Sequence, residues 1–379
     1  MKRIIPFFVL LTLVSESAIS QIFQNDYYNR HDTVMMEGDI IFNVQAAAFF
    51  YNNEFFNPYN KGYTLIGSNF QPQLIYQSNS KLKLAAGINL QRYFGENSDI
   101  YAKPILSIEY RPSDKFTILL GSFNGGENHR THDAIFTFEN HLTSLIENGI
   151  LINYSGPIFS TETWLNWESF ILPGDTIQEQ FTAGSSNRVR IFKSASWELT
   201  IPFTLLAHHA GGQINNSSAR VETLINVSEG LRISRALELI FINNIFAELN
   251  VFHSLGDFIP SSGMGYSVKS GLQSEHFELN VEYFKARDFI SFAGNPLYNT
   301  YEKTGNPLLP YKYGGSNEMI NLKTGYRQKI GNKSYLFARL EAYYFTGRSK
   351  PDYSYSLHFQ VIDFLKAGSS RKQVIHPVN

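Results

Sequence analysis

The chain has 379 residues, a formal net charge of −1 and no cysteine. Without cysteine it has neither disulfides nor thiolate metal sites, and without a strong net charge no global field favours nucleic acid. Hydrophobic residues make up 43% of the chain, but a mean hydropathy of −0.20 is too low for a helical membrane protein. Aromatic residues, at 15%, are abundant enough to form girdles at two membrane interfaces.

Residues 1–20 have the pattern of a secretory signal peptide. Basic residues at positions 2 and 3 precede an apolar run, and small residues stand at the cleavage spacing before Gln21. The apolar run is shorter than the ~20 residues that span a bilayer, so a cleaved signal is predicted rather than an anchor. Residues 21–38 then form a polar periplasmic lead-in that is too short to be a plug domain.

From position 39 onward, apolar and polar residues alternate in segments of strand length. In 276–283, aromatic and aliphatic residues take every second position, and Glu278, Asn280 and Glu282 fall between them. Because successive side chains of a strand point to opposite faces, each segment has one apolar and one polar face. About sixteen strands are predicted in this way, an even number as bacterial barrels require: 39–51, 63–77, 82–94, 101–111, 116–124, 149–155, 158–170, 180–193, 197–207, 218–229, 236–251, 263–273, 276–285, 317–329, 334–345 and 353–364.

The connections between these strands alternate in length. The short set is 78–81, 112–115, 156–157, 194–196, 232–235, 274–275 and 331–333, and the long set is 52–62, 95–100, 125–148, 171–179, 208–217, 252–262, 286–316 and 346–352. Short periplasmic turns and long extracellular loops produce this alternation in outer-membrane barrels. We therefore predict an all-β chain, a transmembrane antiparallel up-and-down β-barrel over 39–364, with a soluble β-propeller as the alternative fold.

This architecture resembles the porin-like outer-membrane β-barrels of Gram-negative bacteria, and the Phe- and Asn-rich strands are similar to those of Bacteroidota barrels. The resemblance covers 39–364 and implies an outer-membrane location, contact with outer-membrane lipid and insertion by the barrel-insertion machinery. No cofactor is expected. One departure is the polar C-terminal tail, 365–379, which follows Phe364 where such barrels usually end on an aromatic residue. Either the machinery reads an internal signal, or the tail has a periplasmic role.

The polar faces of the predicted strands carry charges of both signs. A lone charge facing lipid costs roughly 2–4 kcal/mol at the membrane midplane, so these side chains are expected to face the lumen. Opposite charges often share a strand, which favours ion pairs that brace the wall over a selectivity filter of one sign. The pore-lining candidates are Lys83, Glu109, Arg111, Arg188, Arg190, Arg220, Glu222, Lys269, Lys323, Arg327, Arg339 and Glu341.

The third long connection, 125–148, contains two groups of candidate residues. By resemblance to porins, whose third loop folds inward, Glu139, His141 and Glu147 are constriction-loop candidates; the alternative is an exterior loop packed on the rim. His129, His132 and Asp133 are weak candidates for a Zn²⁺ or other divalent-metal site, because these are the ligand types such ions take. No helix fixes their spacing, so a hydrated loop is favoured and no metal is expected.

Three functions follow from these patterns. The main hypothesis is a porin-like channel for passive diffusion of small polar solutes, without nucleic-acid partners and with homo-oligomerisation left open. The second is a barrel scaffold whose outer loops bind a glycan or a partner protein, since the connection 286–316 is rich in Tyr. The third is an outer-membrane lipid hydrolase built on His253, Ser254 and Asp257. No G-x-S-x-G motif is present, so we expect that the chain is not an enzyme.

Overall fold

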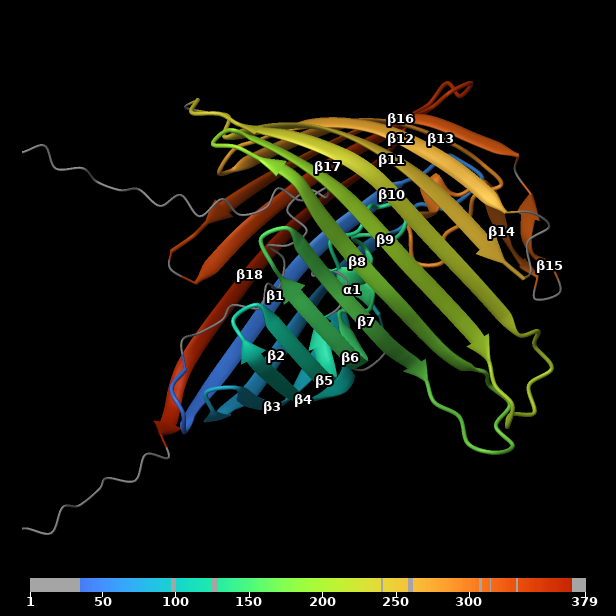
Figure 1. Cartoon of the computed structure of the whole chain (residues 1–379). Coiled ribbons are helices and arrows are strands. Elements are labelled where there is room, and N and C mark those ends of the chain that lie inside the picture. The colour runs from blue at the N-terminus through green and yellow to red at the C-terminus, as the bar shows by residue number, and fades with distance from the viewer. Residues whose placement is uncertain are drawn as a thin grey trace, which may run out of the picture.

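The sixteen predicted strands form one closed antiparallel barrel in the computed structural model (Figure 1). The structure describes residues 35–369 except for 97–99, 125–128, 240, 258–261, 307–308, 314 and 332. Each barrel strand pairs with its neighbour in sequence, except that β13 pairs with β16, and β1 pairs with β18 to close the ring. The predicted β-barrel is thereby confirmed, and the alternative β-propeller is not observed in the described part of the chain. The predicted signal peptide lies outside the described residues.

Most observed strand bounds lie within a few residues of the predicted ones. The barrel strands are β1 (Asp39–Glu54), β2 (Thr64–Asn79), β3 (Leu82–Tyr93), β4 (Tyr101–Ser113), β5 (Phe116–Asn124), β6 (Ile146–Ser155), β7 (Phe159–Ser169), β8 (Glu179–Lys193), β9 (Trp197–Gly211), β10 (Glu222–Ala236), β11 (Asn244–Gly256), β12 (Gly263–Gln273), β13 (Phe277–Arg287), β16 (Ser316–Lys329), β17 (Ser334–Phe345) and β18 (Asp352–Ser369). Within the connections lie α1 (Asn140–Thr143), η3 (Pro296–Tyr298), and the hairpin β14 (Tyr301–Asn306) and β15 (Leu309–Tyr313).

The alternation of the sequence becomes the two surfaces of the wall. On β13, Phe277 and Val281 face outward and are 40% and 43% exposed, whereas Glu278 and Glu282 face inward and are 3% and 1% exposed. An apolar outer surface suits lipid tails, and the polar groups turn away from them. Among the described residues no helix has the length and apolar character needed to cross a membrane.

The two ends of the barrel differ as the connections predict. The start of β1 pairs with the end of β18, Asp39 with Ser369, so both ends of the described chain lie together (Figure 1). The short turns share this end, and the hairpin β14–β15 and the longer loops lie at the other end. The first end is therefore assigned to the periplasm and the second to the outside.

Predicted boundaries are wrong around the turn between β10 and β11, where β11 begins at Asn244 rather than at 236, and at the end of the last strand. The expected turn 232–235 lies inside β10, because Arg232 faces the lumen and its Nη1 lies 2.8 Å from Oε2 of Glu248 on β11. Two polar residues close together in a sequence, such as Arg232 and Arg235, suggest a turn when the position of the partner Glu248 is unknown. The last strand also continues beyond Phe364 to Ser369, where Lys366 lies 2.8 Å from Asp39. The first part of the predicted tail is thus strand, and 370–379 lie outside the described residues.

The middle of the lumen is packed with side chains. One buried cluster joins Phe252 and Phe284 of the wall to Phe289 and Tyr298, which belong to the connection after β13. A second cluster packs Leu142 and its neighbours in the connection after β5 against β1 and β17. Two extracellular connections therefore fold into the barrel and bury apolar surface there, which gives a transmembrane barrel an interior core.

Candidate functional site

The connection after β5 crosses the lumen, and we call residues 129–146 the lumen strap. It starts at His129, whose imidazole lies 2.7 Å from Glu162 and 3.2 Å from Glu147, and stacks on Trp164 at a centroid distance of 3.5 Å. Burial lowers the pKa of His129, but the two carboxylates outweigh burial and raise it to about 9. The strap is therefore held to β6 and β7 by a charged imidazole.

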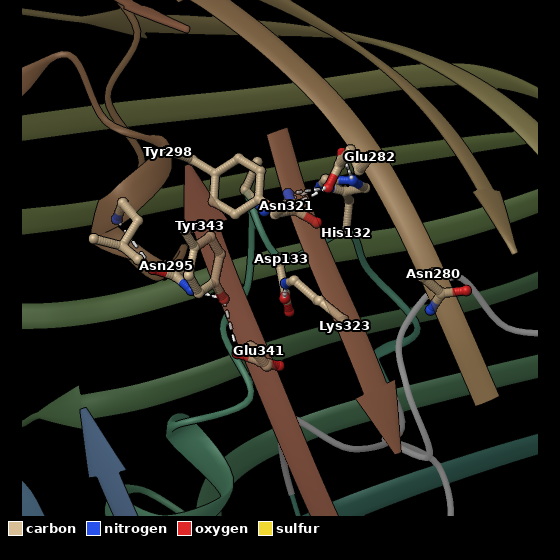
Figure 2. A network of polar contacts seen from close by, with 12 residues as sticks. His132, Asp133, Asn280, Glu282, Asn295, Tyr298, Asn321, Lys323, Glu341 and Tyr343 are labelled. Atoms are coloured by element: carbon tan, nitrogen blue, oxygen red, sulfur yellow. Dashed lines mark hydrogen bonds and ion pairs between the residues drawn. The ribbon is translucent and has the colours of Figure 1, made fainter. Parts of the chain in front are cut away.

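The next residues of the strap bind the opposite wall. His132 Nε2 lies 2.7 Å from Oε1 of Glu282 on β13, and Asp133 forms an ion pair with Lys323 on β16 (Figure 2). In the strand order, β13 and β16 are separated from β6 and β7 by about half the ring. Residues 129–133 therefore span the barrel from wall to wall.

Further side chains join the polar network that holds the lumen strap to β13 and β16 (Figure 2). Tyr298 of η3 donates to Glu282 at 2.7 Å, and Asn321 donates to the same carboxylate at 2.9 Å. Tyr343 accepts a hydrogen bond from Asn295 at 3.1 Å and donates to Glu341 at 2.7 Å. These groups are buried and bonded to one another, so the network holds the strap and η3 in place rather than presenting a reactive group.

The constriction-loop candidates all lie inside the barrel rather than on its rim. Glu139 accepts a hydrogen bond from Tyr63, and His141 is fully buried against Phe138 at a centroid distance of 5.1 Å. Burial and the nearby Arg339 lower the pKa of His141 well below its usual range, so it is neutral. Glu147 belongs to β6 and contacts His129.

The weak metal candidates do not converge. His129 contacts β6 and β7, His132 contacts Glu282, and Asp133 contacts Lys323. Within the described part of the chain no three metal-ligating side chains gather at one point. The two His side chains serve as carboxylate partners instead.

All but one of the pore-lining candidates lie on barrel strands and face inward. Their ion pairs join Glu109 to both Lys83 (3.0 Å) and Arg111 (2.8 Å), Arg190 to Glu198 (3.1 Å), Lys323 to Asp133, and Arg339 to Glu341 (2.6 Å). Arg188, Glu222, Lys269 and Arg327 also lie on inward positions. Arg220 is the exception, because it lies in the β9–β10 connection.

The predicted cluster of His253, Ser254 and Asp257 is wrong. Ser254 is fully buried in the lumen, where its hydroxyl accepts a hydrogen bond from the Ile290 amide at 3.3 Å. His253 precedes it on β11 and points to the other face, because neighbours on a strand alternate. Sequence neighbours on one strand cannot form a nucleophile–base pair.

A different hydroxyl–imidazole pair lies on the outer face. Alternate residues of β9 face outward, as the 39% and 40% exposure of Phe203 and Leu205 shows, and His209 has the same parity. The β9–β10 register pairs His209 with Thr223, and His209 Nδ1 lies 3.0 Å from Thr223 Oγ1. Both residues are half-buried and lie at the extracellular ends of their strands.

Neighbouring strands shape the surroundings of this pair. The same register row places Phe181 of β8 and Trp167 of β7 beside His209, with centroid distances of 5.2 Å and 5.4 Å along the row. Gly211 leaves room for the imidazole, since a Cβ there would stand 2.7 Å from His209 Nε2. The aromatic side chains form a shelf at the level where interfacial girdles lie.

Polar groups complete the other side of the pair. Asp257 follows β11, and its carboxylate accepts a hydrogen bond from the Thr223 amide at 3.0 Å. The exposed Arg220 guanidinium donates to the main-chain oxygen of Asp257. A hydroxyl within hydrogen-bond reach of an imidazole can act as a nucleophile with its base. The sequence predicts loops at 208–217 and 252–262, whereas β9 continues to Gly211 and β11 to Gly256. Only the strand register shows that Thr223 lies beside His209.

The closed, apolar-walled barrel with one set of long loops defines an outer-membrane β-barrel protein. Its fold is similar to OprD from Pseudomonas aeruginosa (TM-score 0.53, 11% identity, 92% of this chain and 100% of that chain). It is also similar to OccK2 (OpdF; TM-score 0.50, 8%, 88% and 100%) and OpdK (0.50, 9%, 87% and 100%), both from Pseudomonas aeruginosa. At these identities the likeness shows the fold alone, and it confirms the resemblance to porin-like barrels.

The chain belongs to the lipid A 3'-O-deacylase-type family, whose model matches residues 29–366. The expectation that the chain is not an enzyme is therefore wrong, because this is a family of enzymes. The missing G-x-S-x-G motif misled the prediction, since that motif belongs to a strand–turn–helix structure that a barrel wall does not contain. No curated protein sequence matches the chain.

Proposed function

We propose that this protein is an outer-membrane lipid hydrolase that removes an ester-linked acyl chain from lipid A. Membership of the deacylase-type family over 29–366 carries this proposal. The outward-facing His209–Thr223 pair supports it, because an enzyme acting on a lipid of the outer leaflet needs its reactive groups on the outer face, near the extracellular end.

The geometry supports the following chemistry. His209 accepts the Thr223 proton while Oγ1 attacks the ester carbonyl carbon, and it then returns that proton to the departing sugar oxygen. The resulting acyl-threonine is hydrolysed by a water that His209 deprotonates, which releases the fatty acid and restores the hydroxyl. Trp167 and Phe181 offer an apolar surface to the acyl chain, and Arg220 offers a cation to the anionic headgroup.

Mass spectrometry of lipid A after incubation with the purified, folded barrel tests this proposal. Thr223→Ser keeps the hydroxyl and should retain deacylation, whereas Thr223→Val and His209→Gln should lower it by about 100-fold or more. Thr204→Val is the matched control, because this β9 residue faces the lumen. Deacylation that survives Thr223→Val unchanged would show that another group attacks the ester.

Passive diffusion of small polar solutes is the second candidate, favoured by the polar lumen and the OprD-like fold. Solutes would have to pass the lumen strap, so the strap would gate any conductance. For either function we infer export by residues 1–20, cleavage before Gln21, and insertion of the barrel by the outer-membrane machinery.

A further inference from the structure

A polar cavity of about 280 Å³ lies in the periplasmic half of the lumen, below the strap. It lies among strands β4 to β9 near their short turns, as Ser155 at the end of β6 and Ser160 at the start of β7 show. Three arginines, Arg111, Arg130 and Arg188, line it. Among the described residues of the lining, Glu162 alone carries a carboxylate, and its Oε1 already contacts His129.

Two of the three cavity arginines, Arg130 and Arg188, differ from the arginines of the wall that form ion pairs. Arg111 pairs with Glu109, and outside the cavity Arg190, Arg232 and Arg339 each pair with a glutamate. For the guanidinium groups of Arg130 and Arg188, the described residues supply neither a hydrogen bond nor an ion pair. Among the described residues, these two guanidinium groups therefore line the cavity without a carboxylate in direct contact, and an anionic ligand would supply that contact.

The backbone at Arg130 shows that its position is imposed by the fold. Its φ of 49° lies in the left-handed region, which residues with a Cβ seldom adopt. The neighbouring His129 is fixed between two carboxylates, and the Arg130 carbonyl accepts a hydrogen bond from Ser186 Oγ at 3.4 Å. Ser186 stands two residues before Arg188, so this contact brings both arginines to one side of the cavity. Such strain persists where the surroundings determine the backbone.

We propose that this cavity binds a small phosphomonoester from the periplasm. A guanidinium presents paired N–H donors that match phosphate oxygens, and two of them neutralise a dianion. The hydroxyls of Ser155, Ser160 and Ser186 would bind a polar substituent. The volume lies near the lower end of the ~300–1,000 Å³ of ordinary ligand pockets, so the ligand is small. This site is independent of the outward-facing pair proposed for deacylation.

Isothermal titration of the detergent-solubilised full chain with glycerol 3-phosphate tests the proposal, with malonate and glycerol as comparison ligands. We expect saturable binding of glycerol 3-phosphate, weaker binding of malonate and none of glycerol. Arg188→Gln and Arg130→Gln should raise the Kd by about tenfold or more, a loss of one charge-assisted pair. Arg190→Gln is the matched control, since Arg190 lies two residues beyond Arg188 on β8 and its guanidinium is already paired with Glu198 of β9.

A second measurement needs no substitution. Phenylglyoxal, which modifies arginine, should label Arg130 and Arg188 in the unchanged protein, and glycerol 3-phosphate should protect both from labelling. Absence of saturable binding, equal or tighter binding of malonate, or equal effects of Arg188→Gln and Arg190→Gln would overturn the proposal. Deacylation should be unchanged in Arg188→Gln, which separates this test from that of the outer face.

Discussion

Breaking the ion pair between Asp133 and Lys323 should release the lumen strap. Lys323 is 4% exposed, and its ammonium also lies 5.6 Å and 5.4 Å from the ring centroids of Tyr298 and Tyr343. Lys323→Met keeps the length of the side chain but leaves the Asp133 carboxylate buried without its counter-charge. Removing one partner of a buried pair costs about 3–5 kcal/mol. At about 1.4 kcal/mol per factor of ten, the open state of the strap gains roughly 100-fold or more.

Single-channel conductance in planar bilayers measures this release, because an open strap unblocks the lumen. Lys83→Met is the matched control: Lys83 is also an inward lysine in an ion pair, but it is part-exposed and contacts Glu109 rather than the strap. Combining Lys323→Met with Asp133→Leu removes both charges and should restore closure. If Lys323→Met and Lys83→Met give the same conductance, or the double variant stays open, the strap is not held by this pair.

Three further predictions concern the pH response, the outer pair and the wall. The pKa of His129 is raised in the folded state from 6.5 to about 9. Its contribution to strap closure is therefore fully present below about pH 6.5 and is lost as the pH rises through about 9. Conductance should rise over that pH range, and His129→Gln should abolish this pH dependence. Gly211→Ala should lower lipid A deacylation by about tenfold or more while the barrel stays heat-modifiable on gels, because the new Cβ would displace the His209 imidazole; unchanged turnover would contradict the assigned role of His209. Arg232→Ala should destabilise the barrel by about 3–5 kcal/mol in urea unfolding, because buried Glu248 loses its partner; a loss below about 1 kcal/mol would show that Glu248 is solvated.

The amino-acid sequence predicts the strands of the barrel wall better than it predicts the candidate functional site. The strand count and the two faces follow from a period of two that needs no knowledge of distant residues. The boundary of β10 was missed because Arg232 and Arg235 read as turn residues, and only the position of Glu248 explains a charged side chain there. Local alternation thus predicts each strand but not where a strand carries a long-range ion pair.

The candidate site depends on the register between paired strands, which a local stretch of sequence does not reveal. His209 and Thr223 are 14 positions apart and meet because β9 pairs with β10, whereas His253 and Ser254 are neighbours that point to opposite faces. The strap shows the same limit, since Asp133 and Lys323 are 190 positions apart. Resemblance to porins placed this loop in the lumen, but not its partners.

Alternation and turn length are local properties, so the amino-acid sequence was enough to predict an outer-membrane barrel with a polar interior. The contacts of His129, His132 and Asp133 that hold the strap across the lumen depend on long-range pairing and became visible in the folded barrel alone. The same long-range pairing places a hydroxyl–imidazole pair on the outer face and two arginines, Arg130 and Arg188, in one cavity. These contacts form because the sheet closes into a ring. Closure fixes the register of neighbouring strands and places strands that are distant in sequence on opposite walls of the lumen.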